Sequence, residues 1–173
     1  MSKKALIVID VQNDFVTEVL GTEEARKAIP VISDLVDQFC KDGCHIYYTR
    51  DSHDFNYLKT QEGNGLPIVH CLYGSWGWRV VDSVSRVAGK NITYLNKRQF
   101  GYDDWYSEHL DQFDEVVLCG LCTDVCVISN ALIIKSLFPE LRISVVKDAC
   151  AGTTPLNHQA ALDVMQSCQI YML

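Results

Sequence analysis

The sequence lacks two features that would point to nucleic-acid or lipid partners. It has no stretch of basic residues, since 15 lysines and arginines are outnumbered by 22 acidic residues and the formal net charge is −7. Proteins that bind nucleic acids or anionic membranes usually carry a basic patch, so we expect neither partner. No apolar run approaches the length of a helix that spans a bilayer either.

The start of the sequence also leads us to expect no secretory signal peptide. The residues MSKK lead directly into the apolar run ALIVIDV, which leaves no room for the hydrophobic segment and cleavage site of such a signal. We therefore expect a cytoplasmic location. In that compartment the eight cysteines predict free thiols and no disulfide framework. Because no paired CxxC pattern occurs, the cysteines do not predict a structural zinc site.

No internal repeat, low-complexity tract or linker divides the chain. Its 173 residues and 48% hydrophobic content suffice for one complete core, so we expect a single domain over residues 1–173. Short β-rich runs alternate with helical patterns along that domain. The expected strands are Ala5–Val11, His45–Arg50, Ile92–Lys97, Glu115–Leu121, Arg142–Asp148 and Ile170–Met172. The expected helices are Ile29–Lys41 (with Pro30 in its first turn), Gly77–Ala88, Asp103–Phe113, Thr123–Phe138 and Pro155–Ser167.

Nearly continuous apolar strands separated by helices indicate a parallel sheet that is covered on both faces. With right-handed crossovers this pattern predicts a Rossmann-like, three-layer α/β/α fold around a six-stranded, mainly parallel sheet. In such sheets ligands bind at the carboxyl ends of the strands. Asp10, Asp51, Lys97 and Cys126 all fall at that edge. Their convergence predicts a functional site there.

Cys126 follows the apolar run Glu115–Leu121 and lies early in the next helical segment. With Thr123 as a helix cap, the sulfur would lie in the first helical turn, where free N–H groups and the helix dipole favour the thiolate. Such a strand, turn and helix can present a nucleophile. The alternative is structural, because buried cysteines are mostly small hydrophobic residues. Asp10 could likewise be a structural acceptor, and Lys97 a solvated lysine.

The long irregular segment 51–76 contains a group of candidate metal ligands. Asp51 and His53 follow a strand, and Glu62 and His70 come later in the same loop. These side chains form a mixed nitrogen and oxygen set that suits Zn, Fe or Mn. A polar loop that simply contains histidines is an equally good reading of this spacing. The remaining histidines are expected to be structural or solvated: His45, His109 and His158.

Together these motifs resemble the isochorismatase-like cysteine hydrolases, and within them most closely the nicotinamidases. The resemblance rests on IDVQNDF (9–15), D-x-H…E…H (51–70), Lys97 after a strand, and GLCTDVCV (120–127). It implies hydrolysis of nicotinamide to nicotinate and ammonia, a step of NAD salvage, through a thioester on a cysteine. It also implies a small-molecule amide as substrate and a homo-oligomer, for which Trp105 and Tyr106 could be interface anchors or core residues.

The resemblance assigns a role to each site residue. The catalytic triad would be Asp10, Lys97 and Cys126. The oxyanion hole would be the backbone N–H groups of Cys122 and Cys126, next to a cis peptide bond between Leu121 and Cys122. One divalent ion, zinc first and iron or manganese as alternatives, would be held by Asp51, His53, His70 and the additional carboxylate of Glu62.

Two segments depart from the nicotinamidase pattern. The segment before His70 reads LPIVH, without the tryptophan that many nicotinamidases have there, and Phe100-Gly101-Tyr102 replaces a serine-alanine-phenylalanine turn. The substrate ring could be held instead by Phe15, Trp76, Trp78, Phe100 and Tyr102. The alternatives are a related hydrolase for another small amide or carbamoyl compound, or an inactive binding homologue. Isochorismatase activity fits less well, because it uses neither the cysteine nor the metal.

Overall fold

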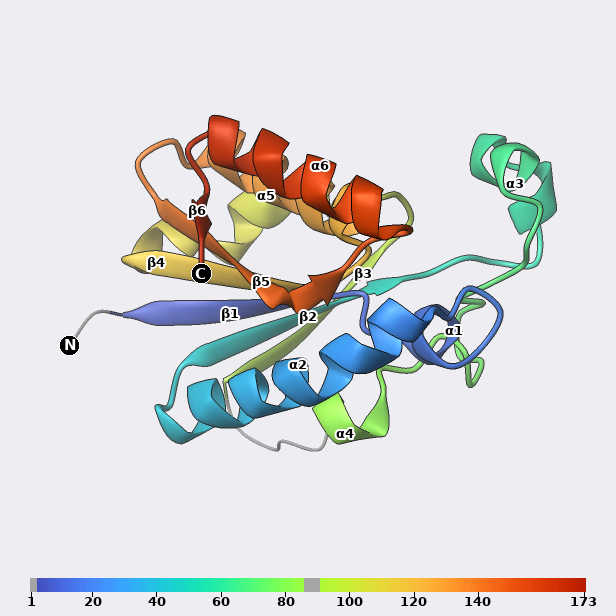
Figure 1. The fold of residues 1–173 in the computed structure, drawn as a ribbon, viewed down its shortest axis with the longest axis horizontal. Coiled ribbons are helices and arrows are strands. Elements are labelled where there is room, and N and C mark those ends of the chain that lie inside the picture. Colours follow the sequence, from blue (N-terminus) through green and yellow to red (C-terminus); the bar gives the residue numbers. More distant parts are fainter. Residues whose placement is uncertain (1–2, 86–90) are drawn as a thin grey trace.

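The computed structural model describes residues 3–85 and 91–173. Six strands form one sheet in the order β3-β2-β1-β4-β5-β6, and every neighbouring pair is parallel. The sheet lies between two helical layers, with α2 and α4 on one face and α5 and α6 on the other (Figure 1). The strands are β1 (Lys4–Ile9), β2 (His45–Asp51), β3 (Ile92–Lys97), β4 (Glu115–Leu121), β5 (Arg142–Ala151) and β6 (Tyr171–Met172). The predicted three-layer fold is confirmed.

The helices differ more in length than the sequence pattern suggests. They are α1 (Asn13–Val16), α2 (Glu23–Lys41), α3 (Gln61–Gly65), α4 (Asp82–Ser85), α5 (Ile128–Leu137) and α6 (Pro155–Ser167). Short 3-10 turns form η1 (Tyr57–Lys59), η2 (Trp105–Glu108) and η3 (Leu110–Gln112), and a π-helical turn forms η4 (Thr123–Val127). In the described part of the chain, every helix is too short or too polar to cross a membrane.

The predicted start of α2 is wrong by six residues. The helix begins at Glu23, because the Thr22 hydroxyl accepts a hydrogen bond from the Ala25 N–H and caps the first turn. Pro30 therefore lies inside the helix, on its exposed side. Because proline has no N–H group, the carbonyl four residues earlier lacks its helical hydrogen bond, and on this side it can bond to water instead.

Two other predicted helices are shorter or of another type. Of the expected helix 77–88, the structure shows only α4, and residues 86–88 lie outside the described part. The expected helix 103–113 is the pair of 3-10 turns η2 and η3, which meet at His109 with a left-handed φ of 50°. Trp105 is fully buried and belongs to the core, whereas Tyr106 is exposed.

The C-terminal part of β5 shifts its pairing with β4. Leu118 pairs with Val145, but Gly120 pairs with Cys150, so three additional residues of β5 are accommodated between these points. The strand consequently extends to Ala151, three residues beyond its predicted end. This extension brings Thr153 to the wall of the cavity at the carboxyl edge of the sheet.

Candidate active site

The predicted triad residues come together at the carboxyl edge of the sheet. Asp10 directly follows β1, Lys97 is the last residue of β3, and Cys126 lies in η4 after β4. The Lys97 Nζ atom is 2.6 Å from Asp10 Oδ2 and 3.6 Å from Cys126 Sγ. All three residues are buried. An ammonium group therefore contacts both a carboxylate, which can act as acid or base, and a thiol.

Asp10 is held in an unusual backbone conformation with a φ of 48°. The Thr49 hydroxyl donates a hydrogen bond of 2.7 Å to Asp10 Oδ1. The other oxygen, Oδ2, forms the ion pair of 2.6 Å with the Lys97 ammonium. Burial raises the pKa of Asp10 above its ordinary value, although Lys97 and Thr49 act in the opposite direction. Such a carboxylate is a suitable proton acceptor.

Lys97 remains charged in this environment. Burial lowers its pKa, but the Asp10 carboxylate and the Cys126 sulfur raise it more, so that the net shift is upward. Its ammonium also donates a hydrogen bond of 3.0 Å to the Gln99 carbonyl and lies 3.6 Å from Asp51 Oδ1. Lys97 thus connects the triad to the candidate metal ligands.

The resting form of Cys126 is the thiol. Burial raises its pKa well above the ordinary value, and this outweighs the lowering effect of Lys97. The predicted cap is wrong: the N-cap position belongs to Cys122, while the Thr123 hydroxyl pairs with His158 Nδ1 at 2.7 Å. A π-helical turn, a feature frequent at functional sites, carries the cysteine.

The turn before Cys126 has a tightly defined backbone. The peptide bond between Leu121 and Cys122 is cis, at the position that the family resemblance implies. Gly120 has a φ of +123°, and a Cβ atom there would lie 2.1 Å from the Ile9 carbonyl oxygen of β1. Only glycine fits this close approach between β4 and β1. The placement of the cysteine turn thus depends directly on strand pairing.

Four side chains next to the triad form a set of metal-donor atoms. One donor atom each from Asp51, His53, Glu62 and His70 lies within 4.8 Å of all the others. His70 Nε2 is 3.5 Å from Asp51 Oδ2 and 3.9 Å from Glu62 Oε1. His53 Nε2 is 3.6 Å from Glu62 Oε1 and forms a hydrogen bond of 2.9 Å with Asp51 Oδ2. Neighbouring ligands of a tetrahedral zinc, at about 2.0–2.2 Å from the ion, lie about 3.3–3.6 Å apart, and two of these four separations fall in that range.

Surrounding groups orient these donors. His70 Nδ1 hydrogen-bonds to the Ile68 carbonyl at 2.7 Å, which leaves Nε2 for an ion. The Gln12 side chain donates to the Asp51 carbonyl and accepts from the Asp51 N–H, at 2.9 and 2.8 Å. Burial raises the pKa of Asp51, but hydrogen bonds with His53 and His70 lower it by more. The net pKa is below its ordinary value, so the carboxylate stays ionised. The donor set suits one divalent ion without selecting among zinc, iron and manganese.

One cavity of about 270 Å³ opens onto both the thiol and the donor set. Its polar end includes Cys126, Asp51 and His70, and the remaining wall is mainly apolar. Of the aromatic residues expected to hold a substrate ring, Phe15 and Phe100 line this cavity. Leu66 lines it as well, in the segment where the expected tryptophan is missing.

Three of the aromatic residues predicted for the wall lie elsewhere. Trp76 is half exposed, and its backbone carbonyl accepts a hydrogen bond from the Asn13 amide. Tyr102 packs edge-on against Trp105, with ring centroids 5.1 Å apart. Trp78 lies beneath the Arg50 guanidinium and donates to the Ser52 hydroxyl. None of the three residues lines this cavity, so Trp76 and Tyr102 do not form the cavity wall as predicted.

Comparison with known proteins identifies the family. The model of the isochorismatase domain matches residues 4–173. The chain belongs to the isochorismatase family. A nicotinamidase from Saccharomyces cerevisiae is 27% identical in an alignment 173 positions long, and the alignment covers 75% of this chain and 80% of the yeast protein.

Solved structures of the family are also similar. The crystal structure of the nicotinamidase/pyrazinamidase PncA from Bacillus subtilis superposes with a TM-score of 0.88, at 27% identity and 98% coverage of both chains. The pyrazinamidase of Pyrococcus horikoshii in complex with zinc gives a TM-score of 0.86 at 26% identity, with 99% and 98% of the two chains covered. A member of the family with the same fold therefore binds zinc.

Several supporting residues of the site escaped the sequence analysis. Gln12 and Thr49 orient Asp51 and Asp10, and Asn130 bonds the backbone of Cys126. The available signal was a polar residue within an otherwise apolar segment. That signal shows that a partner is needed, but it does not show which one.

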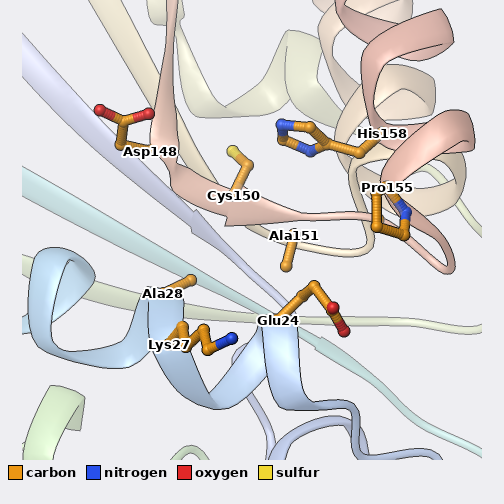
Figure 2. Close-up of a pocket in the computed structure, with 9 residues that line it drawn as sticks. Glu24, Lys27, Ala28, Asp148, Cys150, Ala151, Pro155 and His158 are labelled. Carbon is orange, nitrogen blue, oxygen red and sulfur yellow. The ribbon is translucent and has the colours of Figure 1, made fainter.

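A second cavity of about 280 Å³ lies between α2 and the start of α6 (Figure 2). Figure 2 shows Glu24 and Lys27 of α2 across from Cys150 of β5 and His158 of α6. Burial raises the pKa of the Cys150 thiol to about 12, and the ring of His158 already pairs with Thr123. This cavity therefore lacks an activated nucleophile.

Proposed function

We propose that this protein is a metal-containing cysteine amidohydrolase that converts nicotinamide and water to nicotinate and ammonia. The observation that carries the proposal is one cavity that joins the Asp10–Lys97–Cys126 cluster to the four metal-donor side chains. The yeast, Bacillus and Pyrococcus relatives, described as nicotinamidases or pyrazinamidases, support a small aromatic carboxamide as substrate.

The first half of the reaction forms a thioester. Asp10 takes the proton of the Cys126 thiol, and the Lys97 ammonium stabilises the resulting thiolate. The sulfur attacks the amide carbonyl carbon, while the backbone N–H groups of Cys122 and Cys126 receive the developing oxyanion. The C–N bond then breaks, and the departing nitrogen takes the proton from Asp10 and leaves as ammonia.

The second half of the reaction returns the thiol. Asp10, again a carboxylate, removes a proton from water, and the oxygen attacks the thioester carbonyl. The C–S bond breaks, the carboxylic acid product forms, and the Asp10 proton returns to the Cys126 sulfur. The upward pKa shift of Asp10 supports this role, because a group with an ordinary pKa would be a weak base near neutral pH.

Asp51, His53, Glu62 and His70 are proposed to hold one divalent ion, with zinc supported by the Pyrococcus relative. When bound, the ion supplies a Lewis-acidic centre for the ring nitrogen of the substrate. Phe15, Phe100 and Leu66 would enclose the ring and exclude water. Cys126 would then face the carboxamide.

We also propose a cytoplasmic homo-oligomer. All eight cysteines are free in the structure, which supports a reducing compartment. Exposed aromatic residues such as Tyr106 and Phe55 support contacts between copies, since large exposed apolar groups are common at interfaces.

The experiment that tests the substrate is ammonia release by the purified, metal-loaded protein. Nicotinamide and pyrazinamide are compared with benzamide, which lacks a ring nitrogen, and with small aliphatic and carbamoyl amides. We expect rapid release from the two nitrogen-containing rings and little from benzamide. Preference for an aliphatic or carbamoyl amide would overturn the nicotinamidase proposal and retain the amidohydrolase chemistry.

A further inference from the structure

Asn130 of α5 is completely buried and lies one turn after Cys126. Its Nδ2 atom donates hydrogen bonds to the Cys126 carbonyl at 2.8 Å and to the Phe100 carbonyl at 3.3 Å. Its Oδ1 atom accepts from the Tyr102 N–H at 2.9 Å and from Trp105 Nε1 at 2.8 Å. Both ends of the amide are therefore used.

These contacts join two segments that are distant in sequence. One is the turn that carries Cys126, and the other begins at Lys97, the last residue of β3. In the second segment, Lys97 donates to the Gln99 carbonyl, and the next residue, Phe100, lines the cavity. Asn130 thus links the backbone of the thiol-bearing residue to the backbone beside its cationic partner and to one wall of the cavity.

A buried asparagine must be hydrogen-bonded in any case, and ordinary helix contacts can satisfy part of this need. Ser129, its neighbour, illustrates the ordinary case: its hydroxyl donates to the Val125 carbonyl four residues earlier in the same helical segment. Asn130 makes the corresponding bond to Cys126 and then reaches across to residues 100–105. The cross-link, rather than the burial, points to a role at the site.

We propose that Asn130 is a positioning residue that fixes the Cys126 sulfur relative to the Lys97 ammonium and the Phe100 wall. The inference deepens the proposed function, on which it rests. The distance between Sγ and Nζ is 3.6 Å, and the cation can favour the thiolate only at close range. A displacement of the order of an ångström at a reacting atom lowers rates by about 100-fold.

Two substitutions separate the halves of this link. Asn130→Ala removes both carbonyl contacts, and we expect kcat/KM to fall by about 10- to 100-fold. Asn130→Ser keeps a hydroxyl that can bond the Cys126 carbonyl, as Ser129 bonds Val125, but loses the reach to Phe100. We expect N130S to recover most of kcat while KM stays raised.

Alkylation of Cys126 by iodoacetamide supplies a readout that needs no substrate. The rate is followed against pH, and the modified residue is identified by mass spectrometry. In N130A the thiol loses part of the influence of Lys97, so the midpoint of alkylation should move to higher pH. In N130S the midpoint should return toward the wild-type value.

Trp105→Phe is the matched control, because it removes one hydrogen bond from Asn130 Oδ1 and leaves both carbonyl contacts in place. Its thermal unfolding is measured beside that of N130A and N130S. We expect W105F to lose stability and to keep the wild-type alkylation midpoint. The proposal is overturned if N130A alkylates and turns over like the wild type, or if W105F moves the midpoint as far as N130A. If N130A does not fold, the alkylation midpoints and KM values of N130S and W105F are compared instead. A raised KM in N130S but not in W105F supports the proposal, and equal values in both contradict it.

The two proposals can fail separately. If the wild-type protein releases no ammonia from nicotinamide, the proposed function fails while the alkylation profiles still test Asn130. If hydrolysis is rapid but the profiles of N130A and the wild type coincide, the proposed function stands and the positioning role is wrong.

Discussion

Burial and neighbouring charges decide what each ionisable residue of this site can do. Burial raises the pKa of Asp10 and of Cys126, while Lys97 opposes both shifts. The cation therefore keeps a carboxylate available beside a thiol, and the proton can move between them when a substrate arrives. Thr49 adjusts this balance, because its hydroxyl stabilises the charged form of Asp10.

Replacing that hydroxyl should shift the acid limb of the activity profile. Thr49→Val keeps the side-chain shape but removes the hydrogen bond to the carboxylate, so the pKa of Asp10 rises further. Because Asp10 must be unprotonated to accept the thiol proton, activity is lost as pH falls through this pKa. Loss of a hydrogen bond to a charged group corresponds to about one to two pH units, so the acid limb of T49V should move to higher pH by about that amount. The measurement is kcat/KM for nicotinamide against pH.

Thr93→Val is the matched control for this shift. Thr93 lies on β3, and its hydroxyl pairs with His45 of β2 at 2.8 Å. Its replacement removes a threonine hydrogen bond without affecting Asp10. We expect T93V to keep the wild-type acid limb. An unshifted limb in T49V would contradict the assignment of that limb to Asp10.

The chemically demanding residues could be predicted from sequence, whereas their supports could not. Asp10 and Lys97 fall at strand ends, and they stand out because they converge with Asp51 and Cys126 at one edge of the predicted sheet. The position of Trp76 depends on the packing of the loop 51–76 against Asn13, whose amide donates to the Trp76 carbonyl, and no local pattern encodes this contact. The contacts of Asn130 likewise form only when residues 100–105 pack against α5, so the sequence alone does not reveal them.

At the scale of elements, the junction of β4 with the cysteine turn determines the site. Gly120 lets β4 approach β1 and is followed by the cis bond and η4. The strands were predictable because their apolar runs are nearly continuous. The π-helical turn and the two 3-10 turns were not, since their residues fit a helical period and tertiary packing decides the type of turn.

Adding one methyl group at Gly120 should disrupt this junction. Gly120→Ala combines a left-handed φ with a clash against the Ile9 carbonyl. Gly43→Ala is a matched control, because Gly43 also has a positive φ of +69° but no atom lies within 4 Å of its added Cβ. We expect G43A to lose about 1 kcal/mol of unfolding free energy and G120A about 1–3 kcal/mol more.

Urea unfolding measures both variants. Equal losses of stability in G120A and G43A would show that backbone conformation alone, and not the close approach of β4 to β1, requires glycine at position 120.

At the scale of the whole molecule, the metal donors connect the loop 51–76 to the sheet. Asp51 ends β2, whereas Glu62 lies in α3, which stands apart from the helical layers in Figure 1. An ion bound by both would therefore stabilise the folded chain. At about 100 times its Kd, binding contributes about 2.7 kcal/mol, or a rise in Tm of about 5–10 °C for a chain of this size.

Thermal unfolding of chelator-treated protein, with and without added zinc, measures this effect. His70→Ala should abolish the rise, because it removes a donor whose Nε2 faces Asp51 and Glu62. His109→Asn should retain it, since His109 is exposed and asparagine tolerates its left-handed backbone. A full rise in H70A would contradict the donor set.

Hydrolysis of nicotinamide by Cys126→Ala tests the central claim most directly. The comparison includes wild-type protein and Cys40→Ala, which removes a partly buried thiol from α2, and bound metal is quantified in every sample. We predict that C126A folds and retains its metal but loses at least about 10³-fold in kcat, because it removes the sulfur that lies beside Lys97 and forms the proposed thioester. C40A should keep the wild-type rate. Substantial ammonia release by C126A would contradict covalent catalysis at Cys126.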